Sequence, residues 1–146
     1  MRKSNQDIGK EGEAIARDFL ESSDYKIVAF NFIAPIGNSR SGRVTTGEID
    51  IIAYDLSRHP NVLAFVEVKT RSSDELAAPE ASVDRRKQRQ IIRAARVYRR
   101  VMAVTDEPYR FDVVTILAIP GEPRKIKILK NYFRESNQKH RRDLHS

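Results

Sequence analysis

The hydrophobic pattern divides the chain into two helical segments and five strand-like segments. Apolar residues recur at helical spacing in residues 5–22 and 81–103. β-Branched and apolar residues dominate shorter segments bounded by turn formers, and we expect these to be strands: 25–32, 47–54, 64–71, 109–119 and 125–129. The order helix, three strands, helix, strand and a further edge strand predicts an α/β domain, with a mixed central sheet flanked by helices.

Each helical segment has one apolar stripe that can pack on a sheet. In the first helix the stripe consists of Ile8, Ile15, Ala16, Phe19 and Leu20. In the second helix it consists of Ile91, Ala94, Ala95, Tyr98 and Met102. Polar residues with short side chains precede both segments and are the expected N-caps: Ser4 or Asn5 for the first helix, and Ser82 or Asp84 for the second.

The second helix carries an excess of cations beside its stripe. Eight Lys or Arg residues fall within sixteen positions, and only Asp84 lies nearby to offset them. A charge run usually forms a solvated face, but this one lacks the mixed signs of an ordinary salt-bridged surface. We therefore expect it to bind phosphate, with the nucleic-acid contacts in its first turns: Arg85, Arg86, Lys87 and Arg89.

Residues 33–46 are rich in Gly, Ser and Pro and are predicted to form a long loop, a kind of segment that is often functional. Arg40 and Arg43 lie at its tip. These two side chains could contact phosphate or simply be solvated, and the sequence does not decide between the two.

The net charge of +7 is unevenly distributed. Residues 1–80 hold 10 Lys and Arg against 13 Asp and Glu, whereas residues 81–146 hold 17 against 7. A strongly cationic half suggests a polyanionic partner, and nucleic acid before a membrane. The absence of cysteine excludes disulfides and thiolate metal sites. No signal-peptide core and no run of roughly 18 apolar residues is present, so we expect a cytoplasmic protein without membrane contact.

Three charged residues interrupt two strands that are otherwise apolar enough for a core. Glu67 and Lys69 are two residues apart, so they share one face of their strand. A hairpin with the preceding strand can bring Asp50 beside Glu67. Because buried charge is unfavourable unless it is paired or binds a metal, the three residues indicate a site.

Structural interpretations compete with the functional ones. Glu67 and Lys69 could form a buried ion pair with Asp50 capping a turn, although such pairs stabilise proteins poorly. Glu13, on the first helix, is by spacing alone a solvated carboxylate. Asp112 lies inside a predicted strand, and we expect it to pair with a neighbouring cation.

Asp50, a spacer and Glu67-Val68-Lys69 on the next strand resemble the bipartite signature of the PD-(D/E)xK nucleases. That superfamily has a restriction-endonuclease-like core of the same αβββαβ order. Four segments between residues 7 and 133 are similar to the YraN-like family of small bacterial proteins, described as predicted endonucleases: Gly12-Glu-x-Ala, Gly47-Glu-Ile-Asp-Ile-Ile-Ala, Phe65-Val-Glu-Val-Lys-Thr-Arg and Arg110-Phe-Asp-Val-Val.

The resemblance implies a metal-dependent site for phosphodiester hydrolysis. Asp50 and Glu67 offer the hard oxygen ligands that Mg²⁺ or Mn²⁺ prefers, with water and the Val68 carbonyl completing the shell. Lys69 is expected to orient or deprotonate the attacking water, or to stabilise phosphate charge. In resolvase-like members an acidic residue of the first helix also lies at the metal, and Glu13 matches that place.

We therefore expect one nuclease-like domain, residues 1–134, and a basic disordered tail, residues 135–146. The expected activity is a Mg²⁺- or Mn²⁺-dependent endonuclease acting on nucleic acid, with DNA favoured over RNA and branched or structured DNA included. The alternative is a non-catalytic nucleic-acid-binding protein that keeps the nuclease-like fold. A homodimer is compatible with both.

Overall fold

In the part of the chain that the structure describes, two helices and five strands follow one another in the predicted order. The structure is a computed structural model that describes residues 4–72 and 83–135. Its elements are α1 Asn5–Ser22, β1 Tyr25–Asn38, β2 Val44–Asp55, β3 Val62–Ser72, α2 Arg85–Val101, β4 Tyr109–Ala118 and β5 Lys125–Phe133. The sheet has the order β1-β2-β3-β4-β5, in which β3 and β4 are parallel and the other neighbours antiparallel. This mixed sheet confirms the α/β class and is consistent with a restriction-endonuclease-like core.

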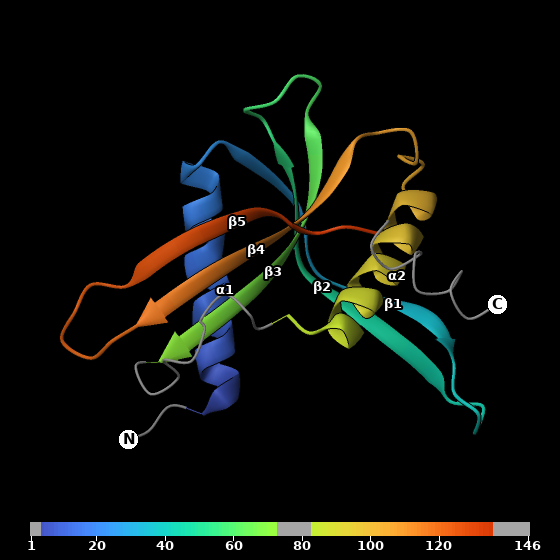
Figure 1. Ribbon diagram of the computed structural model, residues 1–146, viewed down its shortest axis with the longest axis horizontal. Helices are drawn as coiled ribbons and strands as arrows, with labels where there is room; N and C mark the ends of the chain where they lie inside the picture. The colour runs from blue at the N-terminus through green and yellow to red at the C-terminus, as the bar shows by residue number, and fades with distance from the viewer. Residues whose placement is uncertain (1–3, 73–82, 136–146) are drawn as a thin grey trace.

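The helices cover opposite faces of the sheet (Figure 1). α1 packs chiefly on β1 and β3, and Ala16 and Leu20 lie in a buried cluster with Val66. α2 packs on β1 and β2, and Ile91 and Tyr98 belong to a second cluster on the other face. Both clusters follow from the predicted stripes, because each stripe faces the side of the sheet that its helix covers.

The end of each stripe differs from the prediction. Ile8 is 40% exposed and lies in the first turn of α1, and Met102 is 55% exposed and follows the last residue of α2. On α2, Ile92, which is not part of the predicted stripe, is buried. Among the described residues, neither helix is long and apolar enough to cross a membrane.

Short polar side chains cap both helices. The Asp7 N–H donates to Ser4 Oγ at 3.2 Å, and the Lys87 N–H donates to Asp84 Oδ1 at 2.8 Å. Ser4 and Asp84 are therefore the N-caps, and α2 begins later than predicted, at Arg85. The other candidate for α2, Ser82, lies outside the described residues.

The predicted loop 33–46 is wrong. β1 continues to Asn38 and β2 begins at Val44, so only residues 39–43 connect them. The segment pairs as a long antiparallel arm even though it contains proline. Pro35 is tolerated because β1 is an edge strand, where a missing N–H need not break a ladder. The last strand is likewise longer than predicted and extends to Phe133.

The sheet forks in its middle, and this fork positions the site (Figure 1). β1 stays paired with β2 along nearly its whole length, but β2 pairs with β3 only from Ile51 to Asp55. Residues of β2 before Ile51 therefore leave β3 and form an arm with β1. Asp50 is the first residue past the last paired position.

Candidate active site at the fork of the sheet

Where the backbone pairing of β2 with β3 ends, the side chain of Asp50 links the two strands. Its Oδ2 accepts a hydrogen bond from the Val68 N–H of β3 at 2.8 Å. Val68 directly follows Glu67, so this bond holds the carboxylate of Asp50 close to the strand that carries Glu67. The two predicted carboxylates come together because of the fork rather than through a simple hairpin register.

Glu67 is a buried carboxyl between two lysines. Its side chain is 6% exposed, and Lys69 Nζ and Lys87 Nζ lie 3.8 Å and 3.9 Å from its Oε1. Burial, and then the negative charge of Asp50, raise the pKa of Glu67 to about 8, while the two ammonium groups act in the opposite direction. Glu67 therefore holds a proton more strongly than an ordinary glutamate.

One oxygen of this carboxyl lacks a partner. Glu67 Oε2 is buried, and no group in the described part of the chain forms a hydrogen bond with it. An unsatisfied buried oxygen beside a second carboxylate suits a hard divalent cation such as Mg²⁺ or Mn²⁺. The residues therefore fit such an ion, although no three Asp, Glu or His side chains within residues 4–72 and 83–135 come close enough together to hold one.

Glu13 approaches Asp50 from the other face of the sheet. Partial burial raises the pKa of Glu13, and the nearby charges of Asp50 and Glu48 raise it further. The side-chain amide of Asn31 faces the carboxylate of Glu13. It is assigned with its nitrogen toward Glu13, where it donates to both carboxylate oxygens at 3.3 Å, because its oxygen in that place would face only acceptors. Glu13 is thus close enough for the charge of Asp50 to raise its pKa. It is not close enough to Asp50 and Glu67 for the three carboxylates to hold one metal ion together.

Asn31 is a site residue that the sequence analysis missed. Its neighbours Phe30 and Phe32 in β1 pair with Ile51 and Ile49 of β2, so Asn31 lies opposite Asp50. Its φ of 48° is in the left-handed region. Asparagine adopts this conformation more readily than most residues. The available signal was a polar residue between Phe30 and Phe32, which interrupts the apolar character of the strand.

A glycine in β2 allows α2 to reach the fork. A Cβ at Gly47 would lie 2.7 Å from the Gln90 carbonyl oxygen of α2, which is too close for any side chain. The helix backbone therefore packs directly on the strand, and its first turn places Lys87 beside Glu67. Sequence reasoning gave Gly47 no role, because its contact partner is more than forty residues away.

The predicted phosphate-binding cations separate into three groups. Lys87 turns toward Glu67, with its side chain 35% exposed. Arg85, Arg86 and Arg89 are exposed on the same turns of α2. Arg40 and Arg43 are exposed in the turn of the β1–β2 arm, about 20 Å along the strand from Asp50. The structure therefore does not bring this last pair to the carboxylates.

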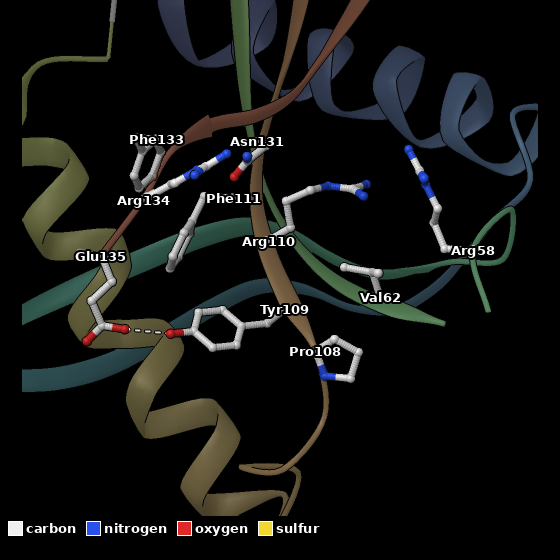
Figure 2. A pocket seen from close by; sticks show the side chains of 10 residues that line it. All are labelled: Arg58, Val62, Pro108, Tyr109, Arg110, Phe111, Asn131, Phe133, Arg134 and Glu135. Atoms are coloured by element: carbon white, nitrogen blue, oxygen red, sulfur yellow. Dashed lines mark hydrogen bonds between the residues drawn. The ribbon is translucent and has the colours of Figure 1, made fainter. Parts of the chain in front are cut away.

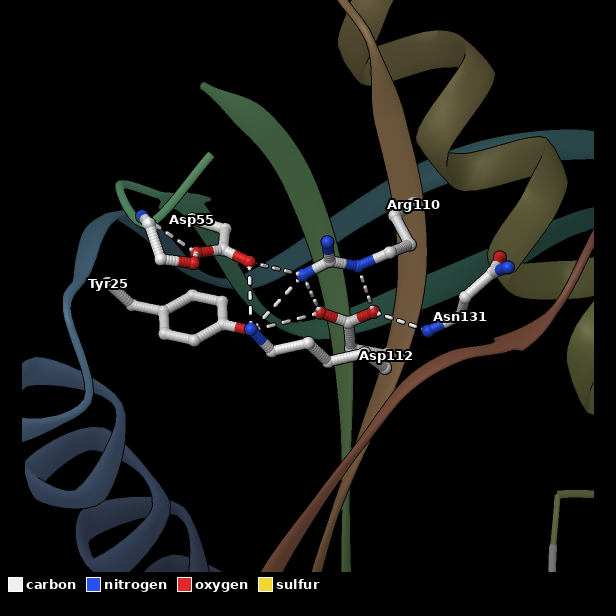
Figure 3. Close-up of polar contacts among 7 residues, drawn as sticks. Tyr25, Asp55, Arg110, Asp112 and Asn131 are labelled. Atoms are coloured by element: carbon white, nitrogen blue, oxygen red, sulfur yellow. Dashed lines mark hydrogen bonds and ion pairs between the residues drawn. The ribbon is translucent and has the colours of Figure 1, made fainter. Parts of the chain in front are cut away.

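A second charged cluster is structural (Figure 3). Arg110 donates through Nε and Nη2 to the two oxygens of Asp112 at 2.7 Å and 2.8 Å, and Nη2 also donates to Asp55 at 2.8 Å. Burial would raise the pKa of Asp55, but hydrogen bonds from Ser57, Arg110 and Lys130 outweigh it and hold that pKa well below its usual range. The predicted pairing of Asp112 with a neighbouring cation is confirmed.

A cavity of about 540 Å³ lies at the start of β3, beside Val62, and neither Asp50 nor Glu67 lines it (Figure 2). Arg58, Tyr109 and Glu135 contribute to its lining, and Tyr109 donates to Glu135 at 2.7 Å. Arg110 also lines it but is already bound to Asp55 and Asp112. The cavity is therefore separate from the carboxylate pair at the fork.

The chain is similar to bacterial proteins of one family. A model described as "Uncharacterised protein family UPF0102" matches residues 12–116. A UPF0102 protein of Geotalea uraniireducens is 39% identical over 132 residues, covering 90% of this chain and 93% of its own. One from Clostridium botulinum strain 657 is 38% identical, with coverages of 91% and 98%, and one from Chlorobaculum tepidum is 41% identical, with 82% of each chain covered. These names describe no activity.

Proposed function

The chain belongs to the UPF0102 family, which is the YraN-like family, and we propose that it is a metal-dependent endonuclease that hydrolyses phosphodiester bonds in nucleic acid. The observation that carries the proposal is the pairing of half-buried Asp50 with buried Glu67, which has one carboxyl oxygen unsatisfied among the described residues and two lysines beside it. In the structural cluster around Arg110, by contrast, both carboxylate oxygens of Asp112 accept hydrogen bonds.

Each group has a role that its position supports. Asp50 and Glu67 would hold Mg²⁺ or Mn²⁺, and the carbonyl of Val68, the residue whose N–H fixes Asp50, would be a further oxygen ligand. A bound ion of this kind neutralises phosphate charge and lowers the pKa of a coordinated water. Lys69 and Lys87 place two ammonium groups at the same carboxyl, where they can bind the oxygens of an incoming phosphate.

Glu13 fits a supporting role better than that of a direct ligand. Its carboxylate is oriented by Asn31 and approaches Asp50 from the α1 side. From there it can accept a hydrogen bond from water bound near the pair. Nucleic acid as substrate is supported by the exposed cations of α2 beside the site, and we propose DNA as the first substrate to test.

The proposal is tested by comparing wild-type protein with Asp50→Asn/Glu67→Gln. Calorimetry with Mn²⁺ should show binding that the double variant loses, and labelled linear, nicked, flapped and four-way DNA should be cleaved only by the wild type. Asp18→Asn/Glu21→Gln is a matched control, because it makes the same two types of substitution at exposed residues of α1. Undiminished Mn²⁺ binding and cleavage in the first variant would overturn the assignment. DNA binding without cleavage by the wild type would favour the non-catalytic alternative.

A further inference from the structure

Beyond Glu67, on the part of the sheet that α2 does not cover, cations occupy positions in β3 and β5. The strand register aligns residues of three strands into two rows that follow Glu67: Lys69, Thr115 and Lys127 in the first row, and Arg71, Leu117 and Lys125 in the second. Lys125 and Lys127 are exposed, and Lys69 is 30% exposed. Every charged residue in these two rows is a cation.

The rows lie on the same face as Glu67. Side chains alternate along a strand, and Ile126 and Ile128 of β5 pack with Val68 against the core beneath α1. Lys125 and Lys127 therefore face the opposite side, as Glu67 and Lys69 do on β3. Figure 1 shows α1 behind β3, β4 and β5 and α2 over β1 and β2, so no helix of the described chain covers the rows.

Cations consequently flank the carboxylate pair on two sides. The first two turns of α2, with Arg85 and Arg89, lie on one side, and the two rows lie on the other. Strand spacing places Lys69 and Lys127 about 10 Å apart and the rows about 7 Å apart, so the cations spread over a surface rather than gathering at one point. A single small anion would not use such a surface, whereas an extended chain of phosphates would.

We propose that Lys69, Arg71, Lys125 and Lys127, here called the β3–β5 cationic face, bind the phosphate backbone of duplex nucleic acid and lead it to Glu67. This inference rests on the proposed function, because it names the surface along which the substrate reaches that same site. Lysines on an edge strand can instead serve to prevent pairing between sheets. That explanation applies to β5 but not to Lys69 and Arg71, which belong to the interior strand β3.

The test is the salt dependence of duplex DNA binding without metal ions, in full-length protein carrying Asp50→Asn to prevent cleavage. Adding Lys125→Gln/Lys127→Gln should lower the slope of log affinity against log salt by up to about 1.8, since each lost phosphate contact removes about 0.9. Lys125→Arg/Lys127→Arg should keep the slope. Lys26→Gln/Arg58→Gln is the matched control, because it removes two exposed cations at the opposite end of the sheet.

The outcomes separate this inference from the proposed function. A lowered slope in Lys125→Gln/Lys127→Gln, with an unchanged slope in the control, supports the β3–β5 cationic face. Equal slopes in the two variants would overturn it, and metal-dependent cleavage by the wild type would then leave the proposed function standing. Failure of the wild type to bind or cleave any nucleic acid would overturn both.

Discussion

At the scale of single residues, Lys69 distinguishes catalysis from simple binding. Lys69→Met keeps the length of the side chain and removes its charge and donors. Because an ammonium group is not a metal ligand, Mn²⁺ affinity should stay close to that of the wild type, and DNA affinity should fall only by the several-fold that one phosphate contact contributes. The cleavage rate should fall on the order of a hundredfold, measured in single-turnover assays. A variant that cuts at the wild-type rate would exclude Lys69 from the mechanism, and one that fails to fold would favour a structural ion pair.

Glu67 should make metal-free stability depend on pH. Its pKa is raised from 4.5 to about 8 in the folded state, so between these values the folded protein holds a proton that the unfolded chain has lost. The free energy of unfolding should therefore fall as pH rises through this window, by at most about 1.4 kcal/mol per pH unit. Urea unfolding in the presence of a chelator measures this dependence. Glu67→Gln should largely remove it, and an unchanged dependence in that variant would assign it to other groups.

At the scale of elements, the contact between α2 and β2 depends on Gly47. Gly47→Ala would push a methyl group against the Gln90 carbonyl, so the helix must shift and stability should fall by about 1–3 kcal/mol. Gly9→Ala is the matched control. A Cβ at Gly9 meets nothing within 4 Å, so the same change there should raise stability by up to about 1 kcal/mol, because alanine favours the helix. Equal effects in urea unfolding would contradict the direct packing of α2 on β2.

The cations of α2 should act at its N-terminal end, beside the fork. Arg85→Gln/Arg89→Gln should weaken DNA binding and reduce the slope of log affinity against log salt by up to about 1.8. Arg93→Gln/Arg100→Gln removes two exposed cations from later turns of the same helix and should change the slope less. Equal changes in the two variants would mean that the whole helix attracts nucleic acid without a preferred contact at the fork.

At the scale of the whole molecule, Arg110 joins strands that are distant in sequence. It pairs with Asp55 of β2 and Asp112 of β4, both of which are fully buried. Arg110→Met would leave two buried carboxylates with less compensation and should destabilise the fold by about 3–5 kcal/mol. Arg124→Met breaks the exposed pair with Glu11 and should change stability by at most about 1 kcal/mol. Similar losses of unfolding free energy for the two variants, measured with urea, would mean that burial does not make the Arg110 ion pairs more important for stability than an exposed pair.

Local pattern was sufficient to predict the order of elements, the two helix stripes and the pairing of Asp112 with a cation. Helix and strand periods act over a few residues, so they are visible along the chain itself. The unusual placement of Asp50, Glu67 and Lys69 within apolar strands was visible for the same reason. Together these patterns indicated the α/β fold and the position of its candidate site.

Tertiary structure alone decided how the site is built. Residues 33–46 look like a loop by composition but form an arm, because pairing between β1 and β2 outweighs weak local preferences. The fork at Asp50, the contact of Asn31 with Glu13, and the approach of Lys87 to Glu67 each join residues that are far apart in the chain. Such contacts depend on strand register and helix packing, and no local period along the sequence encodes them.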